Sequence, residues 1–467
     1  MGEGDAAGST NDGGDGLARS IGLRSAYALV VANMIGAGIF TTTGFQAQAL
    51  GDPVWIYALW FVGGVLALCG ALSYSELGAA MPRAGGEYVY LREAFGGAFA
   101  FMSALVSLTA GFSAPIASAL ESLVRYGSHF FPILGEDVRL VGALGLNDTL
   151  AVALVWGLVA VHALRMRAGI GFNDWITAAK VAGIVAILLG TAAVGTGDLG
   201  GLVRASETIA RPSGGAGLAA FGTSLVFVMF CYSGWNSAAY LAGELREPQR
   251  TLPRALLFGT ATVTVLYLGL NAVYFYGASV DELAGKVEVG LVASRGLFGA
   301  AGVTATIGVL AVSLLASASA MTLAGPRVYY AAGRDYPPLA FLTATRADGT
   351  PVRSLLLQGL VTSAIVLMGN VDQIMQYAGF TLSLFASLAV SCVIVLRVRR
   401  PELERPFRVW AYPLPPLLFL GVSIWMMFWA FQGRPVESSL GLLTVLVGGV
   451  AYGFTRKGRA AGANHDA

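Results

Sequence analysis

Residues 26–45 read AYALVVANMIGAGIFTTTGF, an apolar stretch of membrane length whose centre is interrupted by glycine. Gly36 and Gly38 lie in the middle, and three threonines and a third glycine follow closely. Each glycine lowers helix stability by about 1 kcal/mol relative to alanine. Backbone groups freed by an interrupted helix are tolerated in hydrocarbon only where they line a cavity or are buried in protein. The stretch therefore predicts a broken transmembrane helix beside a cavity.

A second interrupted stretch, FVMFCYSGWNSAAYL, occupies residues 227–241 and carries Ser233, Gly234 and Asn236 at its centre. It lies five spans after the first. Because five is odd, two five-helix repeats have opposite orientations in the membrane. Interrupted helices at matching positions are typical of inverted repeats with a binding site at the midplane. Glycine also permits close helix packing in ordinary transmembrane helices, so no single one of the 62 glycines indicates a break. The inference depends on the recurrence of a glycine-interrupted centre five spans later.

The composition of the whole chain indicates a membrane protein. Of 467 residues, 56% are hydrophobic and 12% are charged, against about 25% charged in an average soluble domain. The mean hydropathy is +0.69. This balance excludes a soluble enzyme, a nucleic-acid-binding protein and a disordered chain. The apolar blocks are continuous and longer than the alternating segments of about 10 residues in a transmembrane barrel, so they predict an all-α membrane protein.

Twelve spans are predicted, and the fourth is the shortest. Their limits are 25–48, 54–79, 99–123, 149–164, 172–196, 216–242, 253–277, 298–322, 354–370, 373–396, 412–432 and 437–455. The corresponding units are a disordered cytoplasmic tail (1–20), a first five-helix repeat (21–200), a second, inverted five-helix repeat (201–400), helices 11 and 12 (401–456) and a cytoplasmic C-terminal tail (457–467). The opening segment has no hydrophobic core of a signal peptide.

The basic residues predict the orientation of these spans. With the N-terminus inside, the inner loops and tails hold 21 of the 29 Lys and Arg residues, the outer loops hold seven, and Lys180 lies within a span. A threefold excess inside agrees with the positive-inside rule. We expect a multi-pass protein of the bacterial inner membrane with both termini in the cytoplasm.

Several motifs resemble the amino acid–polyamine–organocation superfamily. MIGAGIF at 34–40 resembles the glycine-rich first helix of that superfamily, and LSYSELG at 72–78 followed by GGEY at 85–88 resembles the end of its second helix and the next loop. FCYSGWN at 230–236, PQRTLP at 248–253 and RPELERP at 400–406 are similar to the L-type amino acid transporter branch. The resemblance runs from about residue 24 to the C-terminus.

This resemblance implies a LeuT-type fold of two inverted five-helix repeats with two additional helices, and it implies where the substrate binds. The substrate carboxylate is expected against the N–H groups of Gly36, Ala37 and Gly38. Its ammonium group is expected near the carbonyls of Ile35 and Phe230. Phe230 is also expected to act as the gate that closes over the substrate from outside. Two further positions are expected at the site: Ser233 in the break and Asn236, which supports the unwound part of span 6.

Lys180 is one of three lysines in a chain with 26 arginines, and it lies about 12 Å into span 5 at 1.5 Å per residue. A lysine can extend its ammonium group back to the membrane surface, but this depth favours an intramembrane function. In related sodium-independent carriers, a lysine at this place lies near the position that holds sodium in LeuT-type symporters. By that resemblance, Lys180 replaces the ion and contacts span 1 carbonyls, with Ser317, Ser319 and Thr322 facing it. Whether Lys180 also carries a proton as a coupling residue or is only a fixed strut stays open.

The predicted function is sodium-independent secondary transport of neutral L-amino acids by alternating access. Whether the protein is an exchanger or a proton-coupled symporter stays open. An alternative is transport of cationic amino acids or polyamines, and a different class is an ion channel. Channels, however, tend to repeat filter motifs in identical subunits. An enzyme is not expected, because no catalytic constellation is visible.

The expected partners are the amino acid substrate and the lipid bilayer. No nucleic acid, cofactor, metal or catalytic residue is predicted. The three cysteines, Cys69, Cys231 and Cys392, lie within apolar blocks. Animal L-type subunits carry a cysteine after span 3 that is linked to a glycoprotein, and the loop at 126–147 has none. No disulfide-linked ancillary subunit is therefore expected.

Overall fold

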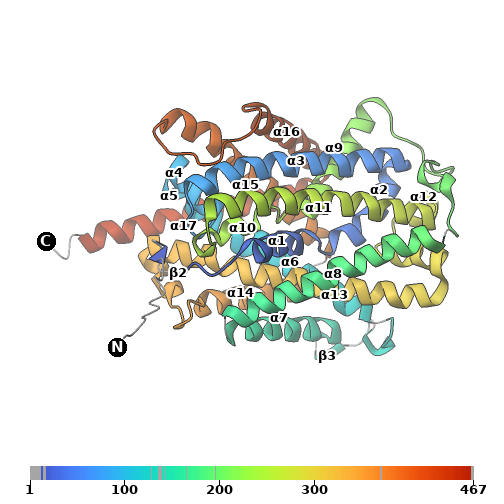
Figure 1. Cartoon of the computed structure of the whole chain (residues 1–467), viewed down its shortest axis with the longest axis horizontal. Helices are drawn as coiled ribbons and strands as arrows, with labels where there is room; N and C mark the ends of the chain where they lie inside the picture. Colours follow the sequence, from blue (N-terminus) through green and yellow to red (C-terminus); the bar gives the residue numbers. More distant parts are fainter. Residues whose placement is uncertain are drawn as a thin grey trace, which may run out of the picture.

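The computed structural model describes residues 12–13, 17–127, 129–134, 139–141, 144–164, 166–194, 196–368 and 371–463. In this part of the chain the only strands are very short: β1 (Asp12–Gly13) pairs with β2 (Leu17–Ala18), and β3 (Arg139–Val141) pairs with β4 (Leu144–Gly145). Everything else regular is helical, which confirms the predicted all-α class. The long helices run side by side in one elongated bundle (Figure 1).

The first predicted break is present. Helix α1 (Leu23–Met34) ends where Ile35 takes an extended conformation with ψ of 91°. The chain resumes as the short 3-10 helix η1 (Gly38–Phe40) and then as α2 (Thr42–Leu50). The two halves of this span are therefore separate helices, joined through the glycines at 36 and 38.

The second predicted break is also present. Helix α9 (Gly214–Tyr232) ends at Ser233, whose ψ of 147° is extended. Gly234 follows with φ of 97°, a value that L side chains rarely adopt. The chain then forms α10 (Ser237–Tyr240) and the 3-10 helix η5 (Ala242–Glu244).

The remaining helices build the bundle around these two breaks. They are α3 (Pro53–Ala80), α4 (Glu87–Phe95), α5 (Gly97–Val106), the π-helical turn η2 (Ser107–Ser113), α6 (Ala114–Gly127), η3 (Pro132–Leu134), α7 (Leu146–Leu164), α8 (Met166–Val194), η4 (Leu199–Leu202), α11 (Pro248–Gly277), α12 (Val280–Leu283), α13 (Val289–Asp335), η6 (Pro337–Thr343), α14 (Val352–Met368), α15 (Val371–Arg399), α16 (Leu414–Gly433) and α17 (Pro435–Ala463).

Ten helical segments of the described chain are long and apolar enough to cross a membrane, and Val352–Leu367 is a shorter apolar helix. The halves of the first span are 12 and 9 residues long, so neither crosses a membrane by itself. The largest departure from the predicted spans is α13, which extends well beyond 298–322 at both ends and kinks at Gly299, where φ is 64°. Helix length and hydropathy together indicate a multi-pass membrane protein.

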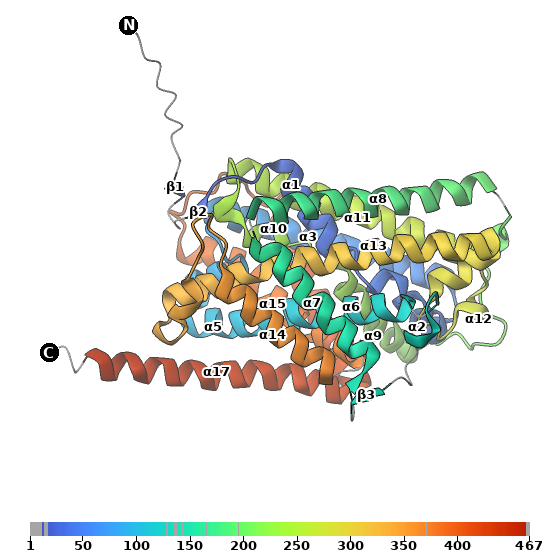
Figure 2. The same cartoon turned by 90° about the horizontal axis from the view of Figure 1, so that it is seen from below.

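The described ends of the chain lie at the same end of the bundle. Strand β2 and the C-terminal end of α17 are found there in both views, and α12 lies at the opposite end (Figures 1 and 2). We call these the β2 end and the α12 end. Residues 1–11, 14–16 and 464–467 of the predicted tails lie outside the described residues. Helix α17 continues through most of the predicted C-terminal tail, because its Ala and Arg residues favour helix.

Candidate functional site

The two breaks face each other at the centre of the bundle, and glycine makes this approach possible. A Cβ atom added to Gly234 would lie 2.9 Å from the Cβ of Asn33 and 3.0 Å from its carbonyl carbon. A Cβ atom added to Gly38 would lie 2.3 Å from the Sγ of Cys231. Real Cβ atoms do not come this close to other atoms, so each break packs against the other through a glycine.

A tyrosine on α11 joins the two breaks, and the sequence did not reveal it. The hydroxyl of Tyr267 lies within hydrogen-bond distance of the Met34 carbonyl and 2.9 Å from the Cys231 carbonyl. These are the last turns of α1 and α9, where carbonyls have no intrahelical partner. Nothing in the pattern distinguishes Tyr267 from the other 16 tyrosines, because its role depends on segments far apart in the chain.

Lys180 on α8 lies wholly inside the protein, with 0% of its surface exposed. Its Nζ atom donates hydrogen bonds to the carbonyls of Ala32, at 3.0 Å, and Ile35. The side chain therefore points to the first break and not to the membrane surface. Both acceptors belong to the end of α1, whose freed carbonyls the ammonium group satisfies.

Of the three hydroxyls predicted to face Lys180, that of Ser317 lies at the first break. A Cβ atom on Gly36 would lie 3.1 Å from the Oγ of Ser317. The Oγ of Ser319 instead pairs with the Nε2 of His162 at 2.9 Å, and Thr322 donates to the carbonyl one turn earlier in α13. The expectation for Ser319 was wrong, because it lies two positions from Ser317 on the helix and therefore points in a different direction. The expectation for Thr322 stays a prediction.

A narrow cavity of about 50 Å³ lies beside the second break. Ser233 and Asn236 are in its wall, as are Ser383 and Glu87. The other lining residues are Asn33, Gly111, Phe112, Met229, Gly234, Trp235, Ser237, Tyr240, Met321, Leu382, Ala386 and Phe419. Two of the predicted site residues, Ser233 and Asn236 from the second break, therefore line the same cavity.

The other predicted site residues lie next to the cavity and not in its wall. Gly36 keeps some exposed surface at the centre of the bundle, whereas Ile35, Ala37 and Gly38 are buried. Phe230 is 8% exposed, and its Cβ would lie 3.3 Å from a Cβ added to Gly379 on α15. The predicted gate, which belongs to α9, thus lies against α15 at Gly379.

The backbone atoms of the two breaks differ in how far they are already hydrogen-bonded. Within the described residues, the N–H groups of Gly36 and Ala37 have no hydrogen-bond partner. The Phe230 carbonyl accepts from the N–H of Ser233 at 3.0 Å and from its hydroxyl at 2.6 Å, and Lys180 occupies the Ile35 carbonyl. Free N–H groups before a helix favour an anion, whereas the two carbonyls expected to hold an ammonium group already have donors.

Glu87, the first residue of α4, lines the cavity, although it was not among the predicted site residues. Its carboxylate accepts hydrogen bonds from Tyr74, at 2.8 Å, and from Asn236, at 3.4 Å. Ser107 lies 3.5 Å away. Burial raises the pKa of the Glu87 carboxyl, and the hydrogen bonds from Tyr74 and Ser107 oppose this rise. The sequence feature that could have revealed Glu87 is an acidic residue directly after the two glycines at 85 and 86.

Buried ion pairs hold the β2 end of the site together. Arg327 on α13 donates to Glu244 from its Nε atom at 2.9 Å, and both side chains are buried. The chain before α1 also attaches here, because the N–H of Ile21 donates to the Glu244 carbonyl and the N–H of Arg246 donates to the Ile21 carbonyl. The segment after the second break is thereby tied both to α13 and to the start of the chain.

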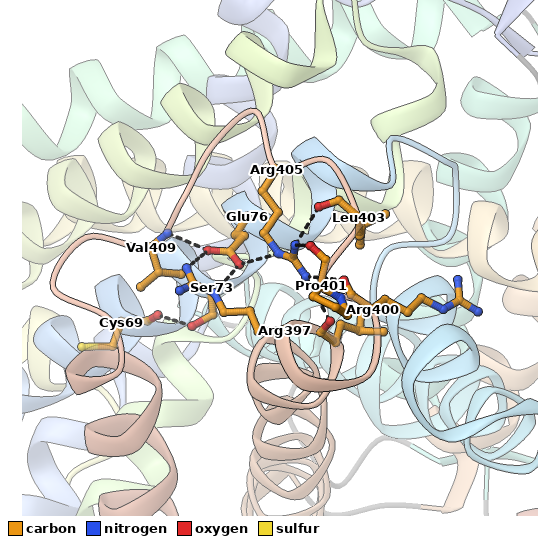
Figure 3. Close-up of polar contacts among 10 residues, drawn as sticks. Cys69, Ser73, Glu76, Arg397, Arg400, Pro401, Leu403, Arg405 and Val409 are labelled. Atoms are coloured by element: carbon orange, nitrogen blue, oxygen red, sulfur yellow. Dashed lines mark hydrogen bonds and ion pairs between the residues drawn. The ribbon is translucent and has the colours of Figure 1, made fainter.

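Figure 3 shows a second buried carboxylate, Glu76 at the end of α3. The Nε of Arg397 donates to it at 2.8 Å, and the Nε of Arg405 lies 3.4 Å from it. The backbone N–H of Val409 donates to the same carboxylate at 2.7 Å. The end of α15 and the loop before α16 are thus fastened to α3.

A family model described as amino acid permease matches residues 21–451. The chain belongs to this amino acid permease family. It is 29% identical to the "Large neutral amino acids transporter small subunit 2" of Rattus norvegicus, over 96% of this chain and 83% of the relative. It is 28% identical to the "b(0,+)-type amino acid transporter 1" of Homo sapiens, over 94% of this chain and 88% of the relative.

These findings confirm the resemblance to the superfamily and to its L-type branch, and they place this permease among transporters and not among enzymes. The name "small subunit" says that those relatives assemble with a further subunit. This conflicts with the expectation, drawn for the present chain from the missing loop cysteine, of no disulfide-linked ancillary subunit.

Proposed function

We propose that this permease is a sodium-independent secondary transporter of neutral L-amino acids that works by alternating access, as an exchanger or a proton-coupled symporter. The observation that carries the proposal is the pair of hydrogen bonds from Lys180 to the carbonyls of Ala32 and Ile35. A side-chain amine bound here stabilises the unwound end of α1, which a sodium ion would otherwise do. Sodium is then unnecessary for substrate binding.

A zwitterionic substrate suits the polarity of the two breaks. The carboxylate binds the unpaired N–H groups of Gly36 and Ala37, helped by the positive dipole end of the half-helix that follows. The ammonium group takes the place of the Ser233 hydroxyl at the Phe230 carbonyl, and the freed hydroxyl becomes an acceptor. Phe230 then closes over the substrate as the gate.

The side chain of the substrate points into the cavity beside Asn236 and Ser383. The small Ser383 leaves room on the α15 side, while Trp235, Met229 and Phe112 supply apolar surface. This lining favours a neutral side chain of moderate size. We also propose that the chain has twelve spans in a LeuT-type arrangement and that its β2 end lies in the cytoplasm of a bacterial cell. The described ends of the chain, β2 and the end of α17, lie at the same end of the bundle, which supports an even number of crossings.

Uptake into proteoliposomes tests this function. Proteoliposomes that contain the purified protein and are loaded with unlabelled L-leucine should take up labelled L-leucine at the same rate in sodium and in choline buffers. Leucine methyl ester and the decarboxylated amine should compete poorly, because both lack the negative charge of the carboxylate. Sodium-stimulated uptake, or equal competition by either analogue, would contradict the proposal.

Transport of cationic amino acids is a second candidate, and Glu87 is the observation that favours it. A carboxylate in the cavity wall can pair with a cationic side chain. Competition of unlabelled L-arginine against labelled L-leucine distinguishes the two candidates: strong competition favours the cationic class, and weak competition favours the neutral class.

A further inference from the structure

Glu87 differs from every other fully buried carboxylate that the structure describes. Four Asp or Glu residues of this part of the chain are buried: Asp52, Glu76, Glu87 and Glu244. Asp52 pairs with Arg211, Glu76 with Arg397 and Arg405, and Glu244 with Arg327. Glu87, which is 4% exposed, has no ion-pair partner among the described residues.

The groups around Glu87 are polar but uncharged at neutral pH. Tyr74 on α3, Ser107 on η2 and Asn236 donate to it. The titratable groups that face it from α4, α10 and α15 are phenols and a thiol: Tyr90, Tyr240 and Cys392. Tyr329 on α13 faces Tyr240 behind them. A buried carboxylate without a cation is costly, and taking up a proton removes the charge.

Glu87 is also attached to a segment that borders the second break. The N–H of Gly85 donates to the carbonyl of Tyr240 on α10 at 3.0 Å. A Cβ added to Gly86, where φ is 54°, would lie 2.7 Å from the Tyr240 ring. The Tyr240 hydroxyl in turn accepts from Asn236 at 3.0 Å. Movement of α10 therefore changes both the hydrogen bonds of Glu87 and its access to water.

We propose that Glu87 is the site at which this permease binds a proton, so that one proton crosses the membrane with each amino acid. The proposal rests on the proposed transport function and names its coupling ion and residue. While the cavity is closed, the carboxyl holds the proton and stays neutral. When α10 moves and water enters, the carboxyl returns toward its usual pKa of about 4.3 and releases the proton into neutral solution.

Lys180 is less suited to this task. It does not line the cavity, and its ammonium group already satisfies two carbonyls of the first break. Losing a proton would weaken both hydrogen bonds, because a charged ammonium group donates more strongly to a carbonyl than a neutral amine does. Lys180 is therefore a fixed strut, and Glu87 is the group whose protonation changes during the cycle.

The test uses full-length protein in proteoliposomes with a trapped pH-sensitive dye. Wild-type protein should accumulate labelled L-leucine under an inward proton gradient, up to about tenfold per pH unit, and added leucine should acidify the interior. Glu87→Gln keeps the shape and the neutral state of the protonated side chain. It should lose at least about 90% of gradient-driven accumulation, and this loss should be much larger than its loss of leucine–leucine exchange at equal pH in the same vesicles.

Control variants separate this role from the alternatives. Glu93→Gln, on the same helix but outside the cavity, should behave like the wild type. Glu87→Asp should still couple, with a shifted pH midpoint of uptake. If Glu87→Gln is too unstable to purify, the pH midpoint of uptake by Glu87→Asp tests the proposal instead. A midpoint equal to that of the wild type would overturn it.

Three results would overturn the proposal while leaving the transport function intact: proton-driven accumulation by Glu87→Gln, net leucine uptake by the wild type without acidification of the interior, or selective loss of L-arginine competition in Glu87→Gln. The last result would make Glu87 a subsite for cationic side chains. Absence of leucine exchange in the wild type would instead contradict the proposed function itself.

Discussion

The ammonium group of Lys180 and the carbonyl of Ile35 are hydrogen-bonded in the interior of the bundle, although 145 residues separate them in the chain. The same ammonium group reaches the Ala32 carbonyl. Helix α8 thereby holds the end of α1 just before the second half of the span begins. This strut gives the most direct test of how the protein operates without sodium.

Replacing Lys180 with alanine should reduce leucine exchange at least tenfold, because two buried carbonyls lose their donor at about 1–3 kcal/mol each. Sodium should not restore the activity, since the described residues hold no cluster of three or more His, Cys, Asp or Glu side chains that could form an ion site. Lys180→Arg should also be impaired, because a planar guanidinium does not replace a compact ammonium group. Lys286→Ala, in an exposed position, is the control. Full activity of Lys180→Ala would contradict the strut.

The two glycines of the first break should respond differently to substitution. Gly38→Ala should destabilise the protein by about 1–3 kcal/mol, because the new methyl group overlaps the Sγ of Cys231. The double variant with Cys231→Ala should recover much of that loss. Gly36→Ala meets only the Ser317 hydroxyl, so it should fold normally and weaken leucine binding.

Melting temperature and leucine-dependent stabilisation, measured on the same detergent samples, check both expectations. Gly157→Ala, where an added methyl group meets no atom within 4 Å, is the control for helix propensity. Equal behaviour of Gly36→Ala and Gly38→Ala would contradict the close approach of Gly38 to Cys231. The β-branched variants Gly36→Val and Gly38→Val should abolish transport while the protein still inserts into the membrane.

Removing the hydroxyl that joins the breaks should weaken transport. Tyr267→Phe leaves the carbonyls of Met34 and Cys231 without their shared donor, at an expected cost of about 1–3 kcal/mol. Tyr274→Phe is a matched control on the same helix, because its buried hydroxyl has no hydrogen-bond partner in the described chain. We expect lower stability and slower exchange only for Tyr267→Phe, and similar results for both variants would argue against the bridge.

The carboxylate of Glu76 should matter for stability more than for substrate binding. Glu76→Gln removes the charge that faces Arg397 and Arg405 and should cost about 3 kcal/mol. Glu93→Gln, which disrupts the half-exposed pairs with Arg83 and Arg400, should cost no more than about 1 kcal/mol. Thermal unfolding compares the two variants, and leucine affinity should stay unchanged in both.

Local patterns along the chain were enough to predict the membrane class and the positions of both breaks. Hydrophobicity over a window of about 20 residues and the conformational freedom of glycine are local properties, so they can be read directly from the amino acids. The depth of Lys180 in its span was visible for the same reason. The extent of α13 was not, because a helix can continue beyond the apolar window where other helices cover it.

Which side chains meet at the breaks became clear only from the packing of the helices. Tyr267 and Ser317 reach the first break from α11 and α13, and Glu87 reaches the second from α4. Ser319 faces His162 and not Lys180. These relationships depend on how helices are rotated and packed against each other over separations of about 150 residues and more, and no local pattern along the chain encodes that rotation.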